Sequence, residues 1–148
     1  MRGFTLIELI LIMAILGIVS VFSVPFLQSF QVSQDTITYS DTVIQFLRRA
    51  QQQAIAGQNS LGWGVFFDNS NRNIVLFQGD SYVTRDADYD IAVSYPAAFI
   101  LSTDFSDEVV FSLYSGLPSV TGTVTFISQN GDTKRVSINS LGLIELNE

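Results

Sequence analysis

The chain contains neither cysteine nor histidine. It therefore forms no disulfide, and zinc sites built on these two residues are excluded. Catalytic arrangements in which a histidine activates a serine or cysteine are excluded as well. Basic residues are scarce, seven against 14 acidic ones, and the net charge is −7. This balance disfavours general nucleic-acid binding, which needs clustered cationic side chains. Separately, no sequence pattern indicates a cofactor, and none is expected.

What is abundant is apolar sequence, with 47% hydrophobic and 14% charged residues over 148 positions. Such a composition can bury a core and is too apolar for a disordered chain. The length indicates one domain in addition to an N-terminal segment of separate character.

The N-terminal segment carries a long apolar run. Residues 9–24 contain no charge, and together with residues 4–8 they make about twenty residues, enough for a helix to cross a bilayer core of ~30 Å. Glu8 is the one charged residue in this span. A carboxylate at membrane depth costs ~2.5–3.5 kcal/mol, so Glu8 is expected to have a partner and a function.

The residues before the run offer such a partner. Cleavage after Gly3 would expose the amine of Phe4, four residues before Glu8. The amine can pair with Glu8 of the same helix, or with Glu8 of a neighbouring helix offset by about 6 Å. The second arrangement repeats from head to tail without closing, which builds a filament.

Gly3, Phe4 and Glu8, followed by the apolar run, resemble the class III signal of type IV prepilins and type II secretion pseudopilins. The resemblance implies cleavage between Gly3 and Phe4 by a prepilin peptidase, N-methylation of Phe4, and docking of Glu8 to the neighbouring subunit. Gly17 and Pro25 stand where pilins often have helix-loosening residues. An ordinary secretory signal ending near residues 21–23 and a simple signal anchor are the alternatives, and Glu8 fits the first badly.

The expected organisation follows from this motif. Residues 1–3 are a leader, residues 4–25 a transmembrane helix, residues 26–57 its amphipathic continuation, and residues 58–148 a β-rich head. Arg2 before the span predicts a cytoplasmic N-terminus and an extracytoplasmic head. The protein is thus expected to be a single-pass inner-membrane protein that is extracted into a pilus or pseudopilus.

A helix is predicted over residues 4–56, kinked at Pro25, loosened near residues 33–40 and capped by Gly57. Val43 and Phe46 widen its apolar stripe, and residues 48–49 and 51–53 form the polar face. The stripe itself consists of Ile37, Ile44, Leu47, Ala50 and Ala54.

Short alternating segments follow Gly57. Residues 62–67 and 74–77 predict a first hairpin, and residues 123–128 and 134–138 predict the clearest one, across an Asn-Gly turn. Residues 98–101, 109–111 and 143–146 are further strand candidates, and residues 81–95 are expected to be a polar loop with at most one strand. The fold class is therefore α+β: a long N-terminal helix packed on an antiparallel β head.

This order resembles that of the H-type minor pseudopilins and the related FimT-like minor pilins, as do residues 46–55, 111–116 and 122–124. The resemblance implies a minor subunit, not an enzyme, that supports protein secretion. Its partners would be a prepilin peptidase and methyltransferase, other pilin or pseudopilin subunits and an inner-membrane assembly platform. The alternative is a FimT-like minor pilin that binds DNA or another ligand for uptake or adhesion. Residues 141–146 lack the arginines that such a role implies, so nucleic acid is disfavoured as a partner.

Other residue groups in the head favour structural interpretations. Asp86, Asp88 and Asp90 alternate in a way that suits calcium, but a solvated acidic loop is favoured and no metal site is assigned. Trp63 is expected in the core. Surface positions are expected for Asp104, Asp107, Glu108, Arg48 and Arg49, and for a small basic spot at Lys134 and Arg135.

Overall fold

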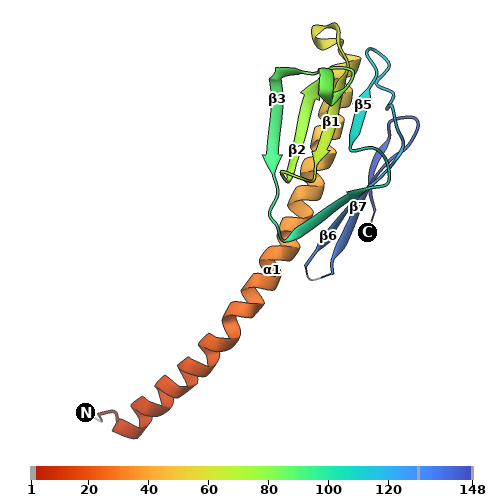
Figure 1. Ribbon diagram of the computed structural model, residues 1–148. Helices are drawn as coiled ribbons and strands as arrows, with labels where there is room; N and C mark the ends of the chain where they lie inside the picture. The colour runs from red at the N-terminus through yellow and green to blue at the C-terminus, as the bar shows by residue number, and fades with distance from the viewer. Residues whose placement is uncertain (1–2, 130, 148) are drawn as a thin grey trace.

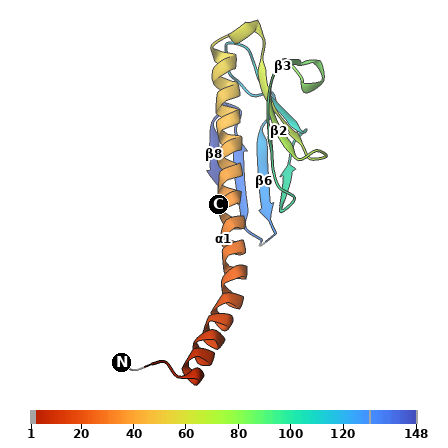
Figure 2. The same ribbon diagram turned by 90° about the vertical axis from the view of Figure 1, so that its left-hand side faces the viewer.

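The computed structural model describes residues 3–129 and 131–147, and within them it describes the side chains outside residues 21–33. One long helix, α1 (Leu6–Ile55), leads into a β-rich head (Figure 1). The N-terminal half of α1 projects away from the head, whereas its C-terminal half lies along it (Figures 1 and 2). This architecture confirms the predicted α+β class with a pilin-like helix.

The ends of α1 follow from capping. Thr5, in extended conformation, caps the N-terminus of α1. At the other end Ala56 is the C-cap residue, and Gly57 follows it with a φ of 65°. The predicted loosening at residues 33–40 is wrong, because α1 is continuous there. The hydroxyls of Thr38 and Ser40 donate to carbonyls four residues earlier, at 3.0 and 2.7 Å, and are thus satisfied within the helix. α1 continues through Pro25, as predicted for a proline that does not end the helix, and the kink at this residue remains a prediction.

The face of α1 that packs on the head has a strict spacing. Its buried positions alternate steps of four and three residues, which keeps them on one side of a helix. They are Thr36, Ser40, Val43, Leu47, Ala50 and Ala54. Ile37 was predicted in this stripe and is instead 41% exposed, because Thr36 takes the inward position.

The head contains two antiparallel four-stranded sheets. The first has the order β3 (Asp86–Ser94), β2 (Asn73–Gln78), β1 (Trp63–Asp68), β5 (Glu108–Phe111). The second has the order β4 (Phe99–Thr103), β6 (Gly122–Ser128), β7 (Thr133–Ile138), β8 (Ile144–Asn147). Two short 3-10 helices, η1 (Gln58–Ser60) and η2 (Tyr82–Thr84), connect α1 to β1 and β2 to β3.

Both predicted hairpins form. β1 pairs with β2, and β6 pairs with β7 with Val124 opposite Val136. These two valines are fully buried together with Phe126, and Ile138 is nearly so, as alternation predicted. Asn130 of the predicted turn lies outside the described residues. The division of the strands into two sheets was not predicted.

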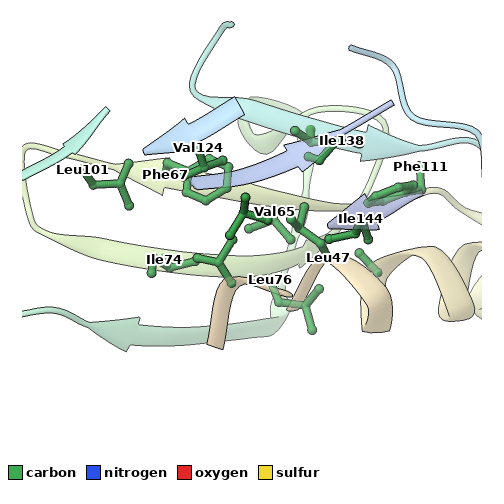
Figure 3. Packing of buried hydrophobic residues seen from close by; sticks show 14 of the residues in the cluster. Leu47, Val65, Phe67, Ile74, Leu76, Leu101, Phe111, Val124, Ile138 and Ile144 are labelled. Atoms are coloured by element: carbon green, nitrogen blue, oxygen red, sulfur yellow. The ribbon is translucent and has the colours of Figure 1, made fainter. Parts of the chain in front are cut away.

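The core lies where α1 meets both sheets. α1 contacts β1, β2 and β5 of one sheet and β6, β7 and β8 of the other. Figure 3 shows Leu47 of α1 among side chains of the two sheets, including Val65, Val124 and Ile144. Only the C-terminal half of α1 is held in this way, so the head presents the N-terminal half as a free projection.

Candidate functional site at the N-terminal end of the helix

Residues 3–5 precede the helix. Thr5 is its N-cap, with φ −82° and ψ 152°, and its side-chain oxygen accepts a hydrogen bond from the backbone N–H of Glu8 at 3.4 Å. The carbonyl of Thr5 also accepts from the N–H groups of Glu8 and Leu9, at 3.1 and 3.2 Å. The first turn is therefore tied to Thr5, while Gly3 and Phe4 remain outside the helix.

The predicted cleavage and methylation residues are accessible. Phe4 is 78% exposed, and a Cβ added to Gly3 would meet no atom within 4 Å. Nothing in the described residues covers the bond between them. Cleavage at this bond and methylation of Phe4 remain predictions.

Glu8 is the acidic residue in the first turn of α1. Its side chain is exposed, and no ion pair to it is found within the described chain. Its position suits the helix terminus, because the N-terminal end of a helix carries a partial positive charge that favours an anion. The structure thus presents a carboxylate that is free to meet another subunit, and its docking role remains a prediction.

Residues 6–20, the described part of the projecting half of α1, are apolar on every side apart from Glu8 and Ser20. Because a helix of this kind is normally covered, it requires a lipid or protein environment. Its exposed apolar side chains in this region are Leu6, Ile7, Leu9, Ile10, Leu11, Ile12, Met13, Ile15, Leu16, Ile18 and Val19. Within the residues that the structure describes, no helix meets the length and hydropathy required to cross a membrane.

The acidic segment in the head is a strand. Residues 86–90 belong to β3, the one strand that the prediction for residues 81–95 allowed, and the solvated acidic loop expected at 86–90 is therefore an exposed strand segment. β3 pairs with β2 on either side of an irregularity between Leu76 and Gln78. Asp90 forms an ion pair with Arg85 at 2.7 Å, and Asp86 accepts from the backbone N–H of Asp88 at 3.2 Å. No group of acidic side chains suited to a metal ion occurs in the described chain.

Three further carboxylates of the head accept hydrogen bonds from neighbouring loops and strands. Asp104 accepts from the N–H of Thr123 at 2.6 Å, and Glu108 accepts from the N–H of Tyr82 at 2.8 Å. Asp107 accepts from the Thr103 hydroxyl at 3.3 Å. These carboxylates therefore have structural partners of their own.

Two ionisable groups near the β1–β2 turn have shifted pKa values. Hydrogen bonds from Asn71, of which the side-chain bond at 2.7 Å has the largest effect, lower the pKa of Asp68 below its ordinary value. Burial raises the pKa of Tyr95, and the neighbouring Asp68 charge adds to this effect. The Tyr95 hydroxyl donates to Asn69 at 2.9 Å. These groups stabilise a turn and form no acid–base pair.

The arginines predicted on the surface and the tryptophan predicted in the core lie as expected. Arg48, Arg49 and Arg135 are exposed, whereas Lys134, which was predicted beside Arg135 in a surface spot, is half-buried. Trp63 is 2% exposed and meets the ring of Tyr89 edge to face.

Gln51 has a role that the sequence did not indicate. It was predicted on the polar face of α1, but it is half-buried, and its amide nitrogen donates to the carbonyls of Gly116 and Gly142 at 3.2 and 3.1 Å. One side chain thus ties α1 to two loops of the head. Because these partners are 65 and 91 residues away, no local pattern reveals the contact.

The motif and the fold agree with the resemblance seen in the sequence. Residues 1–24 match the family model of the prokaryotic N-terminal methylation motif. The chain carries this motif on a long helix that continues into an antiparallel β head, which is the pilin-like arrangement that the sequence resemblance implied.

A solved structure extends the comparison. The chain is similar to the minor pseudopilin EpsH from the Type 2 Secretion System of Vibrio cholerae, with a TM-score of 0.59 and 14% sequence identity. The match covers 76% of this chain and 96% of EpsH. At this identity the likeness shows the fold. A search of curated proteins found no match.

Proposed function

We propose that this chain is a pseudopilin, a structural subunit that joins a type II secretion pseudopilus or a related type IV pilus and supports protein secretion. The observation that carries the proposal is the projecting half of α1. It combines the N-terminal methylation motif with apolar side chains on all sides over residues 6–20, while α1 is packed on the head between Thr36 and Ala54.

Energetics support an assembled or inserted helix. Burying one leucine or isoleucine side chain contributes about 1.5–3 kcal/mol, and the projecting half exposes many of them. In water this surface would drive aggregation. A bilayer covers it before assembly, and a bundle of similar helices covers it in a filament. We therefore propose a single pass through the inner membrane, with the N-terminus in the cytoplasm and the head outside.

The chemistry of the N-terminus supplies the assembly signal. A prepilin peptidase and methyltransferase would cleave between Gly3 and Phe4 and methylate the Phe4 amine. The amine would then pair with Glu8 of the adjacent subunit. This pairing would set the stagger between helices and compensate the cost of placing a carboxylate at membrane depth. An inner-membrane assembly platform would add subunits one after another.

The proposal is tested first by intact-mass analysis of the protein recovered from its native membrane. The expected chain begins at methylated Phe4. A chain that begins at Met1 would indicate a plain signal anchor, and one that begins near residue 24 would indicate a secreted domain. Either result would contradict the proposal.

A Gly3→Leu variant is the matched control for this measurement. Gly3 touches nothing that a larger side chain would disturb, so the variant should insert and fold normally. If the peptidase requires glycine at this position, the variant accumulates as the uncleaved precursor.

The docking role of Glu8 is tested with Glu8→Gln, which keeps the size of the side chain and removes its charge. Membrane insertion should be unchanged or easier, because the cost of the buried carboxylate is gone. Incorporation into the filament should fall strongly when measured by the amount of protein in the sheared or extracted filament fraction. Normal incorporation of this variant would refute the docking role.

A further inference from the structure

The start of α1 is defined by a single side chain. Leu6 and the residues after it are helical, whereas Thr5 is extended and accepts the Glu8 N–H on its side-chain oxygen. The apolar residues on both sides of Thr5 have no side-chain acceptor for this group. Thr5 therefore decides where the helix begins.

The neighbouring residues fit a complete helix-start signature. With Thr5 as the N-cap, Glu8 occupies the third helical position, which is the pattern of a capping box. Phe4 and Leu9 occupy the two apolar positions of a hydrophobic staple, one on each side of that box. The residues of the methylation motif are thus also the residues that stop a helix from extending toward Gly3.

We propose that Thr5 is a positioning residue for cleavage: by ending the helix just after Phe4, it keeps the bond between Gly3 and Phe4 extended and open to a peptidase. This inference rests on the proposed processing of the chain. In the reaction, water adds across this bond. Its oxygen joins the carbonyl carbon of Gly3, the carbon–nitrogen bond breaks, and a proton goes to the nitrogen of Phe4.

The physical reason is access to the backbone. In a helix each carbonyl bonds an N–H four residues later, so a peptide bond within a helix is unavailable to an enzyme that must grip and attack it. If the helix extended through Phe4 to Gly3, the first turn would have to open before each cleavage. A threonine cap shifts this equilibrium about fivefold relative to alanine or valine.

The test compares full-length precursors that differ only at residue 5, in membrane vesicles with the prepilin peptidase. The variants are Thr5→Ser, Thr5→Asn, Thr5→Val and Thr5→Ala, and the readout is kcat/KM for leader removal by intact mass. Valine has the shape of threonine without the acceptor, and asparagine has an acceptor of different chemistry. We expect kcat/KM of the serine and asparagine variants to equal that of the wild type. For the valine and alanine variants we expect kcat/KM to be about fivefold lower.

Hydrogen exchange of the Glu8 amide is the second readout. It should be protected in the wild type and in the serine and asparagine variants, and less so with valine or alanine, because only its bond to the carbonyl of residue 5 then remains. Cleavage of the valine variant at the wild-type rate would overturn the inference. Cleavage of the serine variant at the wild-type rate together with slow cleavage of the asparagine variant would also overturn it, because the enzyme would then recognise the hydroxyl itself. A wild-type chain that is never cleaved would overturn the proposed function as well, whereas equal cleavage of all variants overturns the role of Thr5 alone.

Discussion

Replacing Gln51 by methionine removes two hydrogen bonds and leaves the packing of the helix largely intact. Methionine is unbranched and similar in length, but it cannot donate to the carbonyls of Gly116 and Gly142. Both glycines are buried, so their carbonyls would lose a partner that water replaces poorly. Each bond contributes about 0.5–1.5 kcal/mol, so the variant should lose about 2 kcal/mol of unfolding free energy.

The assay is urea unfolding of the full-length protein in detergent micelles, followed by the fluorescence of Trp63. This residue is the one tryptophan of the chain and is buried in the head, so its signal reports on the head and not on the projecting helix. With a slope of about 1–3 kcal/mol per molar urea, the midpoint should fall by roughly 1 M.

The exposed neighbour Gln52 supplies the matched control, because Gln52→Met changes the same residue type one position along α1. We expect its unfolding free energy to stay within about 0.5 kcal/mol of the wild type. If Gln51→Met is no less stable than Gln52→Met, the assignment of Gln51 as the tie between α1 and the two loops is refuted.

Two further perturbations use the same fluorescence assay. Gly116→Ala should destabilise the head by about 1–3 kcal/mol more than Gly131→Ala, because the new Cβ would lie 2.5 Å from a side-chain carbon of Ile55. Both glycines have positive φ, and Gly131 has no atom within 4 Å of the added Cβ, so equal effects would contradict this packing argument. The lowered pKa of Asp68 contributes stability above its ordinary value of 3.8, and that contribution is lost as the pH falls through the lower folded-state pKa. An Asp68→Asn variant should therefore lose less stability than the wild type between pH 5 and pH 2, and an identical acid dependence would rule out this group as a contributor.

Much of the fold was predictable because its signals are local. The helix was expected over residues 4–56 and is found over Leu6–Ile55, since a long apolar and then amphipathic pattern leaves few alternatives. The β6–β7 hairpin was expected with its buried face correctly assigned, because alternation sets both the pairing and the face.

The errors have different physical causes. Thr38 and Ser40 favour turns as isolated residues, and the predicted loosening ignored their ability to bond to carbonyls four residues earlier in the helix. The acidic residues 86–90 have low strand propensity, but they lie in β3, which pairs with β2 at Asp86 and again from Ile91 to Ser94. Only the second case depends on a contact with a distant segment.

The candidate site divides in the same way. Gly3, Phe4 and Glu8 were predicted from the sequence because the motif lies within six consecutive residues and needs no tertiary context, and their roles remain predictions. The cap at Thr5 became visible only when the helix start was known.

By itself, the sequence determined the long helix, the prepilin-type motif, the hairpins and the lack of histidine or cysteine chemistry, because each depends on residue type or short-range periodicity. The tertiary structure alone decided the division into two sheets and the tie made by Gln51. These features depend on residues far apart in the chain, and their contacts form only when α1 and the strands share one core.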